Sequence, residues 1–155
     1  MRFAIDSNIL VYAFIRDDHR KHKIASDIMV RAMLLDAVVA AQTVGEFLNA
    51  IRRKHPKFFE QAIEQAKRWN KTLNIVGTSR SDVLTGAEFA SQHKLQLWDS
   101  IIWKVARSAH AVLFLTEDLQ DRLSLEGMKV LNPFEPANEL ELRNLLASCD
   151  DEIEW

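Results

Sequence analysis

The sequence has a single cysteine, Cys149, and only four glycines and three prolines among its 155 residues. One cysteine excludes an intramolecular disulfide, which fits a reducing compartment. So few glycines and prolines leave no room for a low-complexity linker, and no repeat of solenoid period is present. No apolar run approaches the roughly 20 residues of a membrane-spanning helix, and Asp6 interrupts the first apolar segment too early for a signal peptide. We therefore expect a single globular domain in the cytoplasm, without membrane association.

The chain also lacks a strong excess of either acidic or basic residues, since its net charge is only −2. Of the 22 acids and 20 bases, residues 135–155 contain seven acids and one base, so residues 1–134 keep 15 acids, 19 bases and a net charge of +4. Clusters of bases in that part of the chain can bind phosphate backbones, although solvated helix faces look similar. We take Arg16, Arg52 and Arg53 from these clusters as candidates for contacts with nucleic-acid phosphates.

Short apolar segments alternate with segments of helical periodicity along the chain. The alternation predicts an α/β fold with a parallel sheet, in which ligands bind at the carboxyl ends of the strands. Two helix starts are suggested by polar residues: Asn8 as the cap of the first helix, and Thr43 with Glu46 as a capping box further along. The predicted strands are Phe3–Asp6, Ala37–Ala41, Leu73–Val76, Val112–Leu115 and Met128–Leu131.

Four acidic residues stand at or near the predicted strand-to-helix junctions. Asp6 closes the first strand, and Asp118 follows the strand Val112–Leu115 by three residues. Glu46 lies on the helix after the second strand, on the face away from its apolar stripe, and Asp99 opens a later amphipathic helix. Because parallel strands bring their carboxyl ends to one edge, the sheet can gather these acids at a single mouth.

Clustered carboxylates repel one another by several kcal/mol per pair at reduced dielectric, so they persist only when protons or cations neutralise them. Oxygen ligands without cysteine or histidine suit Mg²⁺ or Mn²⁺ better than zinc. A metal held in this way activates water and shields the charge of a phosphodiester. The pattern therefore favours nuclease chemistry.

Each acid also has a simpler explanation when it is considered alone. The stretch Asp6-Ser7-Asn8 can be a turn with a capping residue, and Glu46 can belong to the capping box with Thr43. Asp99 is suited to a helix start, and Glu117-Asp118 to a solvent-exposed turn. Four independent caps would not require the shared placement of the acids, and this favours the cluster.

The residues around the acids resemble those of the PIN domain and, more narrowly, of VapC-type toxins and their close prokaryotic relatives. The resemblance runs from Arg2 to Phe134 and implies a three-layer α/β/α sandwich over a parallel sheet. It also implies an Mg²⁺- or Mn²⁺-dependent endoribonuclease, a homodimer, and a cognate antitoxin as partner. The motifs that carry it are Ile5-Asp6-Ser7-Asn8-Ile9-Leu10, Val44-Gly45-Glu46-Phe47, Trp98-Asp99-Ser100-Ile101-Ile102, Leu115-Thr116-Glu117-Asp118-Leu119-Gln120 and Asn132-Pro133-Phe134.

The resemblance also assigns the acids. Asp6, Glu46 and Asp99 match the family's core acidic positions, and Asp118 matches a fourth, more variable one. We expect Asp6 and Asp99 to hold one metal ion, with Glu46 and Asp118 completing the site or binding a second ion. The residues expected to orient ligands or substrate are Ser7, Asn8, Thr116 and Glu117.

Residues 1–134 are expected to form the PIN-like nuclease domain, and residues 135–155 an acidic extension with a short helix from about 138 to 148. The function we expect is an endoribonuclease acting as the toxin of a toxin–antitoxin pair. Two alternatives stay open: a catalytically silent PIN-like module that binds RNA or protein, and an aspartate-based phosphoryl-transfer protein. The haloacid-dehalogenase type of the latter needs a second aspartate two residues after the first, where this chain has Asn8.

Overall fold

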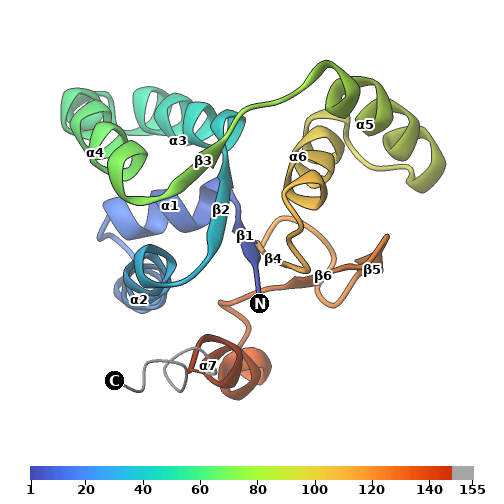
Figure 1. The fold of residues 1–155 in the computed structure, drawn as a ribbon. Helices are drawn as coiled ribbons and strands as arrows, with labels where there is room; N and C mark the ends of the chain where they lie inside the picture. The colour runs from blue at the N-terminus through green and yellow to red at the C-terminus, as the bar shows by residue number, and fades with distance from the viewer. Residues whose placement is uncertain (148–155) are drawn as a thin grey trace, which may run out of the picture.

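The computed structural model describes residues 1–147, and within that range six strands form one sheet in the order β3-β2-β1-β4-β6-β5 (Figure 1). Strands β1, β2, β3, β4 and β6 pair in parallel, and β5 pairs with β6 in the antiparallel sense. The predicted α/β fold with a central parallel sheet is confirmed, with one antiparallel strand added at its edge. The strands are Phe3–Ile5 (β1), Ala37–Ala40 (β2), Asn74–Val76 (β3), Leu113–Leu115 (β4), Ser124–Leu125 (β5) and Met128–Leu131 (β6).

Helices cover both faces of this sheet and make the predicted three-layer sandwich. Figure 1 shows α5 and α6 on one side of the sheet and α1 to α4 on the other. Short 3₁₀ turns at Pro56–Phe58 and Pro136–Asn138 lead into α4 and α7. The helices are Ser7–Phe14 (α1), His19–Leu34 (α2), Ala41–Lys54 (α3), Phe59–Thr72 (α4), Arg80–His93 (α5), Leu97–Ser108 (α6) and Glu139–Ala147 (α7).

Alternating side chains of the central strands supply two separate hydrophobic cores. In β1, Phe3 and Ile5 belong to the core shared with α1, α2, α3, α4 and α7, whereas Ala4 belongs to the core of α5 and α6. In β4, Leu115 and Phe114 divide in the same way. Strands buried on both faces are apolar throughout, which explains why they appear in the sequence as short continuous apolar runs.

The centre of the sheet contains the point where a ligand is expected to bind. Strand β1 lies between β2 and β4. The elements that follow β1 in the chain continue to β2 on one side of it, and those that follow β4 continue to β6 on the other side. Ile5 and Leu115 are paired in register, so the two strands end at the same level. In open parallel sheets the crevice beyond such neighbouring strand ends is the usual ligand site. Asp6 and the loop that begins at Thr116 therefore start side by side.

Two of the predicted helix caps are wrong. The N-cap of α1 is Asp6, not Asn8, and α3 begins at Ala41 directly after β2. Thr43 therefore lies buried inside α3 and forms no capping box with Glu46. Asp99, by contrast, lies in the first turn of α6, as expected for a residue that opens this helix. In both wrong cases the helix begins within two residues of the end of the preceding strand, before the predicted capping residue is reached.

The antiparallel hairpin of β5 and β6 was not predicted. Glu126 and Gly127 form its turn, both with positive φ, at 49° and 81°. A strand of two residues, Ser124–Leu125, is too short to show the alternation by which strands are recognised.

Within residues 1–147, none of the helices has both the length and the apolar character that crossing a bilayer requires.

Helix α7 packs the beginning of the acidic extension onto the body of the molecule. Leu142 and Leu146 are buried in the larger core. Glu141 accepts hydrogen bonds from Arg122 and Lys129, both at 2.8 Å. The predicted helix is thus present as far as Ala147, and residues 148–155 lie outside the described part of the chain.

Candidate active site

Asp6 follows β1 directly, and the residue is only 5% exposed. One carboxylate oxygen accepts the backbone N–H of Ser7 at 2.8 Å, and the other accepts the hydroxyl of Thr116 at 2.7 Å. Burial raises the pKa of Asp6 to about 7, although both hydrogen bonds act against the rise. The negative charges of Asp118 and Glu46 raise it further. Asp6 is therefore a buried carboxylate whose charged neighbours within residues 1–147 repel it.

Thr116 links the ends of the two central strands. Its buried hydroxyl donates to Asp6, and it accepts hydrogen bonds from the side-chain amide of Asn8 at 3.0 Å and the backbone N–H of Asp118 at 3.1 Å. The Asn8 amide also donates to Asp118 Oδ2 at 3.1 Å. These bonds join Asp6 and Asp118 through two uncharged side chains. The oxygen of the same amide, Asn8 Oδ1, is buried without a hydrogen-bond partner in the described part of the molecule.

Glu46 and Asp99 approach the same space from helices in opposite layers. Glu46 is on α3, where its carboxylate accepts a hydrogen bond from Gln42 at 3.2 Å. Asp99 is on α6, and its pKa is raised first by burial and then by the charges of Glu46 and Asp118. Because the charges of Glu46 and Asp118 raise the pKa of both Asp6 and Asp99, the four predicted acids lie in one region of the fold, although no three of them within residues 1–147 converge on a single ion position.

The donor atoms at this site fit a hard divalent cation. Within residues 1–147, no three acidic, histidine or cysteine side chains are placed to hold one ion together. Mg²⁺ keeps several of its waters and usually binds proteins through one or two carboxylates together with substrate phosphates. The acids present, the repulsion felt by Asp6 and the unpartnered oxygen of Asn8 suit that mode of binding. A closed cage of the zinc type does not fit these residues.

Glu117 and Asp118 are neighbours in sequence but have different partners. One carboxylate oxygen of Glu117 accepts the Tyr12 hydroxyl at 2.6 Å, and the other accepts the Lys21 ammonium at 2.8 Å. Asp118 instead contacts Asn8 and is exposed on the side of the other acids. Asp121, the next acid along, accepts hydrogen bonds from the Asn132 backbone and the Asn138 side chain, and so holds the region before α7.

An open groove of about 530 Å³ runs beside these acids. Arg53 lines it, whereas Arg52 lies over the ring of Phe59 at 5.6 Å and Arg16 is exposed outside the lining. Asp6 and Asp99 lie outside the lining as well. The predicted residues that line the groove are Ser7, Asn8, Glu46, Arg53, Glu117 and Asp118.

Several groove residues were missed by sequence reasoning although helical spacing points to them. Tyr12 is four residues after Asn8 and therefore lies on the same face of α1. Asn49 stands three residues after Glu46, on the same side of α3. Lys54 and His55, at the end of α3, carry no such signal, because the turn that follows sets their direction.

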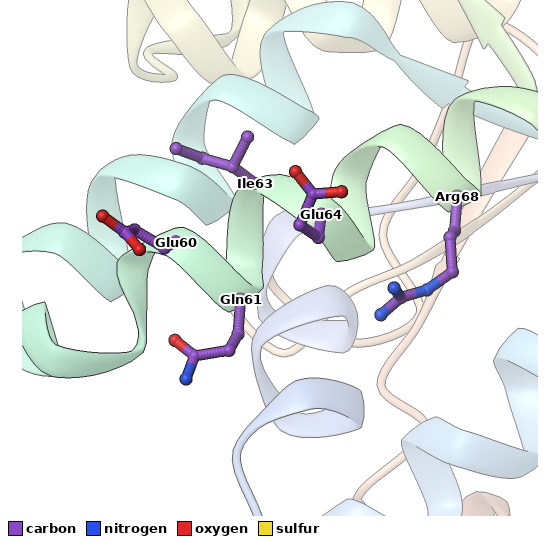
Figure 2. Close-up of a pocket in the computed structure, with 5 residues that line it drawn as sticks. All are labelled: Glu60, Gln61, Ile63, Glu64 and Arg68. Carbon is purple, nitrogen blue, oxygen red and sulfur yellow. The ribbon is translucent and has the colours of Figure 1, made fainter.

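A second hollow, of about 500 Å³, lies along α4 (Figure 2). Figure 2 shows that all of its labelled side chains project from this one helix. A surface lined by successive turns of one helix brings together no catalytic groups from different elements. The groove beside the acids is therefore the candidate active site. The residues of the α4 hollow are Glu60, Gln61, Ile63, Glu64 and Arg68.

The comparisons with known proteins agree with this architecture. The family model of the PIN domain matches residues 3–124. A toxin–antitoxin complex from Klebsiella pneumoniae is 22% identical, with a TM-score of 0.60 over 84% of this chain and 96% of that chain. VapBC2 from Rickettsia felis, bound to a promoter DNA fragment, is 16% identical, with a TM-score of 0.62 over 85% and 98%.

A third similar structure is VapC20 from Mycobacterium tuberculosis, described as a toxin that cleaves the sarcin-ricin loop. It is 13% identical, with a TM-score of 0.60 over 72% of this chain and 86% of that chain. At these identities the structural similarities establish the fold alone. A comparison with curated proteins gives no significant match.

Proposed function

The chain belongs to the PIN domain family, and from this premise we propose that it is a metal-dependent endoribonuclease that hydrolyses RNA phosphodiester bonds. The observation that supports the proposal is the mutual repulsion of acids beyond the ends of β1 and β4, where Asp6 and Asp118 follow the strands and α3 and α6 contribute Glu46 and Asp99. Asp6 is the decisive member, because burial and like charges raise its pKa to about 7. A divalent cation would relieve that repulsion.

The proposed roles follow from where each side chain lies. Asp6 and Asp99 hold a Mg²⁺ or Mn²⁺ ion, and Glu46 and Asp118 complete its site or bind a second ion. When bound, such an ion activates water for attack and screens the phosphodiester charge. Thr116 fixes the orientation of the Asp6 carboxylate through its short hydrogen bond.

The remaining predicted residues have supporting roles in this proposal. Asn8 holds Asp118 through its amide, and Ser7 offers a hydroxyl at the groove. Arg53 contacts RNA phosphates from the groove wall, while Arg52 and Arg16 contact more distant phosphates. The same geometry speaks against a phosphoryl-transfer aspartate pair, since Asn8 donates hydrogen bonds at the position where that chemistry needs an acid.

Partners and domain limits are part of the proposal. Structures with the same fold include toxin–antitoxin complexes, and we propose a cognate antitoxin for this chain, which would act as the toxin in the cytoplasm. We propose a homodimer because α5 and α6 expose large apolar side chains, among them Leu84 at 69% and Trp98 at 62%. The nuclease domain would comprise residues 1–134, with residues 135–155 as an extension.

The decisive experiment is an RNA cleavage assay with the purified protein. A structured RNA should be cut at internal positions in Mn²⁺ or Mg²⁺, and cleavage should stop when EDTA is added. Asp6→Asn should be inactive, whereas Asp27→Asn, which alters an acid outside the groove, should be as active as the wild type. Cleavage that persists in EDTA or in Asp6→Asn would contradict the proposal. Binding of RNA without cleavage would identify the silent binding module.

A further inference from the structure

Three successive residues after β4 are each held by a different set of side chains. Thr116 bonds to Asp6 and Asn8, and Asp118 bonds to Asn8. Between them, Glu117 is bound on its far side by residues of α1 and α2 that the proposed chemistry does not use. The loop that carries Asp118 is thus anchored from two directions.

The anchor on Glu117 is a compact cluster of charged and aromatic groups. Tyr12 donates its hydroxyl to Glu117 Oε1, and Lys21 donates to Glu117 Oε2 and, at 3.2 Å, to the Tyr12 oxygen. The Lys21 ammonium also lies 4.7 Å from the centre of the Tyr12 ring and 5.4 Å from that of Phe134. The side chains of Lys21 and Glu117 are 28% and 21% exposed, so solvent screens this pair less than an open surface pair.

This arrangement determines which of two adjacent acids faces the groove acids. Both carboxylate oxygens of Glu117 are occupied, and Lys21 neutralises its charge. Glu117 therefore does not compete with Asp118 for a cation. Without the cluster, its longer side chain would be free to turn, and the backbone on either side of it would lose an anchor.

We propose that Lys21 and Tyr12 are positioning residues that act through Glu117 to fix the Asp118 carboxylate for cation binding. The inference rests on the proposed function, because it takes Asp118 as a metal ligand. It assigns a role to α2, from which the proposed chemistry otherwise takes no group.

The test is the Mn²⁺ affinity of Lys21→Met, measured by isothermal titration calorimetry without RNA. Removing a positive charge near a cation site strengthens cation binding by Coulomb's law alone. Loss of positioning acts in the opposite direction, and outer-shell partners of metal ligands typically contribute about 10- to 100-fold in affinity. We expect Lys21→Met to weaken Mn²⁺ binding by at least about tenfold. The sign of the change therefore separates positioning from simple electrostatics.

Two further variants of the cluster sharpen the result. Tyr12→Phe changes no charge and removes one donor to Glu117, so it should also weaken Mn²⁺ binding. Lys21→Arg keeps a positive charge and hydrogen-bond donors, although with a different geometry, and should therefore weaken Mn²⁺ binding less than Lys21→Met does. Should Lys21→Met fail to fold, Tyr12→Phe decides the question.

A matched control is present on the other side of the sheet. Lys104 pairs with Glu126 and lies 4.9 Å from the centre of the Phe89 ring, and its side chain is 18% exposed. Lys104→Met removes the same kind of cluster away from the acids, and should lower the melting temperature without changing Mn²⁺ affinity. Unchanged or tighter Mn²⁺ binding in Lys21→Met and Tyr12→Phe would overturn the inference. Absence of Mn²⁺ binding in the wild type would instead contradict the proposed function.

Discussion

The Asp6 carboxylate caps α1, bonds to Thr116 and faces other acids, all while almost excluded from solvent. A cap alone would not require burial, because helix N-termini are satisfied equally well by exposed carboxylates. The combination of burial and like-charged neighbours is destabilising when no cation is present. At the scale of the residue, the stability of the folded protein is therefore expected to depend on pH.

We predict that Asp6→Asn is more stable than the wild type in metal-free buffer near neutral pH. The pKa of Asp6 is about 7 in the folded protein, whereas an aspartate in an unfolded chain has its ordinary pKa of 3.8, so folding takes up a proton between these pH values. Stability of the wild type therefore falls as the pH rises from about 4 to about 7, by an amount on the order of 4 kcal/mol at most.

Thermal unfolding in EDTA at pH 5 and pH 8 measures this effect. The loss of melting temperature between the two pH values should be smaller in Asp6→Asn than in the wild type or in Asp27→Asn. Equal losses in all three proteins would show that Asp6 is not the group responsible. Added Mn²⁺ should stabilise the wild type and leave Asp6→Asn nearly unchanged.

Asp118→Ala should impair RNA cleavage more than Glu117→Ala. Asp118 contacts Asn8 and faces the groove acids, whereas Glu117 is engaged by Tyr12 and Lys21. We expect a loss of at least about 100-fold for a direct ligand, and a smaller one for a residue that acts through its neighbour. Initial rates at saturating Mn²⁺ give the comparison. The reverse order would assign the metal-binding role to Glu117.

Sequence reasoning found the four acids because each stands at a junction between a strand and a helix. It could not find the hydrogen bonds of Thr116 or the cluster around Glu117. These join residues about 100 positions apart, as with Tyr12 and Glu117, whose separation is 105. Which side chains meet across such sequence separations depends on how α1, α2 and β4 pack, and local sequence patterns do not indicate that packing.

At the scale of elements, apolar runs located the parallel strands to within a residue or two. The helix starts were less predictable, as Thr43 shows: its type suits an N-cap, yet β2 runs directly into α3 and leaves it buried. A residue type that suits an N-cap therefore does not fix the start of a helix when a packed strand ends a few residues earlier, because the helix then begins where the strand ends. Of the described strands, β5 gave no signal because it contains only two residues.

The packing of α5 on α6 makes a prediction about Gly86. A Cβ atom at this position would lie 2.8–3.1 Å from the Cγ1, Cα and backbone nitrogen of Ile101. Because backbone atoms cannot move aside as a side chain does, Gly86→Ala should destabilise the protein by about 1–3 kcal/mol. Urea unfolding followed by circular dichroism measures the change.

Gly45 offers the matched control for that substitution. It also lies inside a helix, α3, but a Cβ there would meet no atom within 4 Å. Gly45→Ala should therefore stabilise the protein by about 0.5–1 kcal/mol, since alanine loses less backbone entropy in a helix. Similar effects of the two substitutions would contradict the close α5–α6 contact.

At the scale of the whole molecule, the candidate site exists only when both layers of helices are in place. Asp6 and Asp118 follow two strands of the sheet, Glu46 is on α3, which packs in one core, and Asp99 is on α6, which packs in the other. The order of the strands puts β1 beside β4 and thereby joins the two halves of the chain at the acids. A substitution that loosens either core is therefore expected to lower activity as well as stability.

The charge of the whole chain leads to a last prediction about residues 150–155, which lie outside the described part of the structure. They contain four acids, while residues 1–134 carry a net charge of +4. Acidic side chains of the same molecule compete with RNA phosphates for the basic side chains of the protein, and salt screens that competition. Deleting residues 150–155 should therefore tighten RNA binding at low salt.

Fluorescence anisotropy with a labelled RNA, in EDTA to prevent cleavage, measures this effect. We expect the deletion to increase affinity by at least about threefold near 50 mM salt, and the gain to fade near 300 mM. A variant of full length in which Asp150, Asp151, Glu152 and Glu154 become Asn or Gln separates charge from chain length and should behave like the deletion. The same affinity in all three proteins at low salt would show that these acids do not compete with RNA, because a charge effect must be largest where screening is weakest.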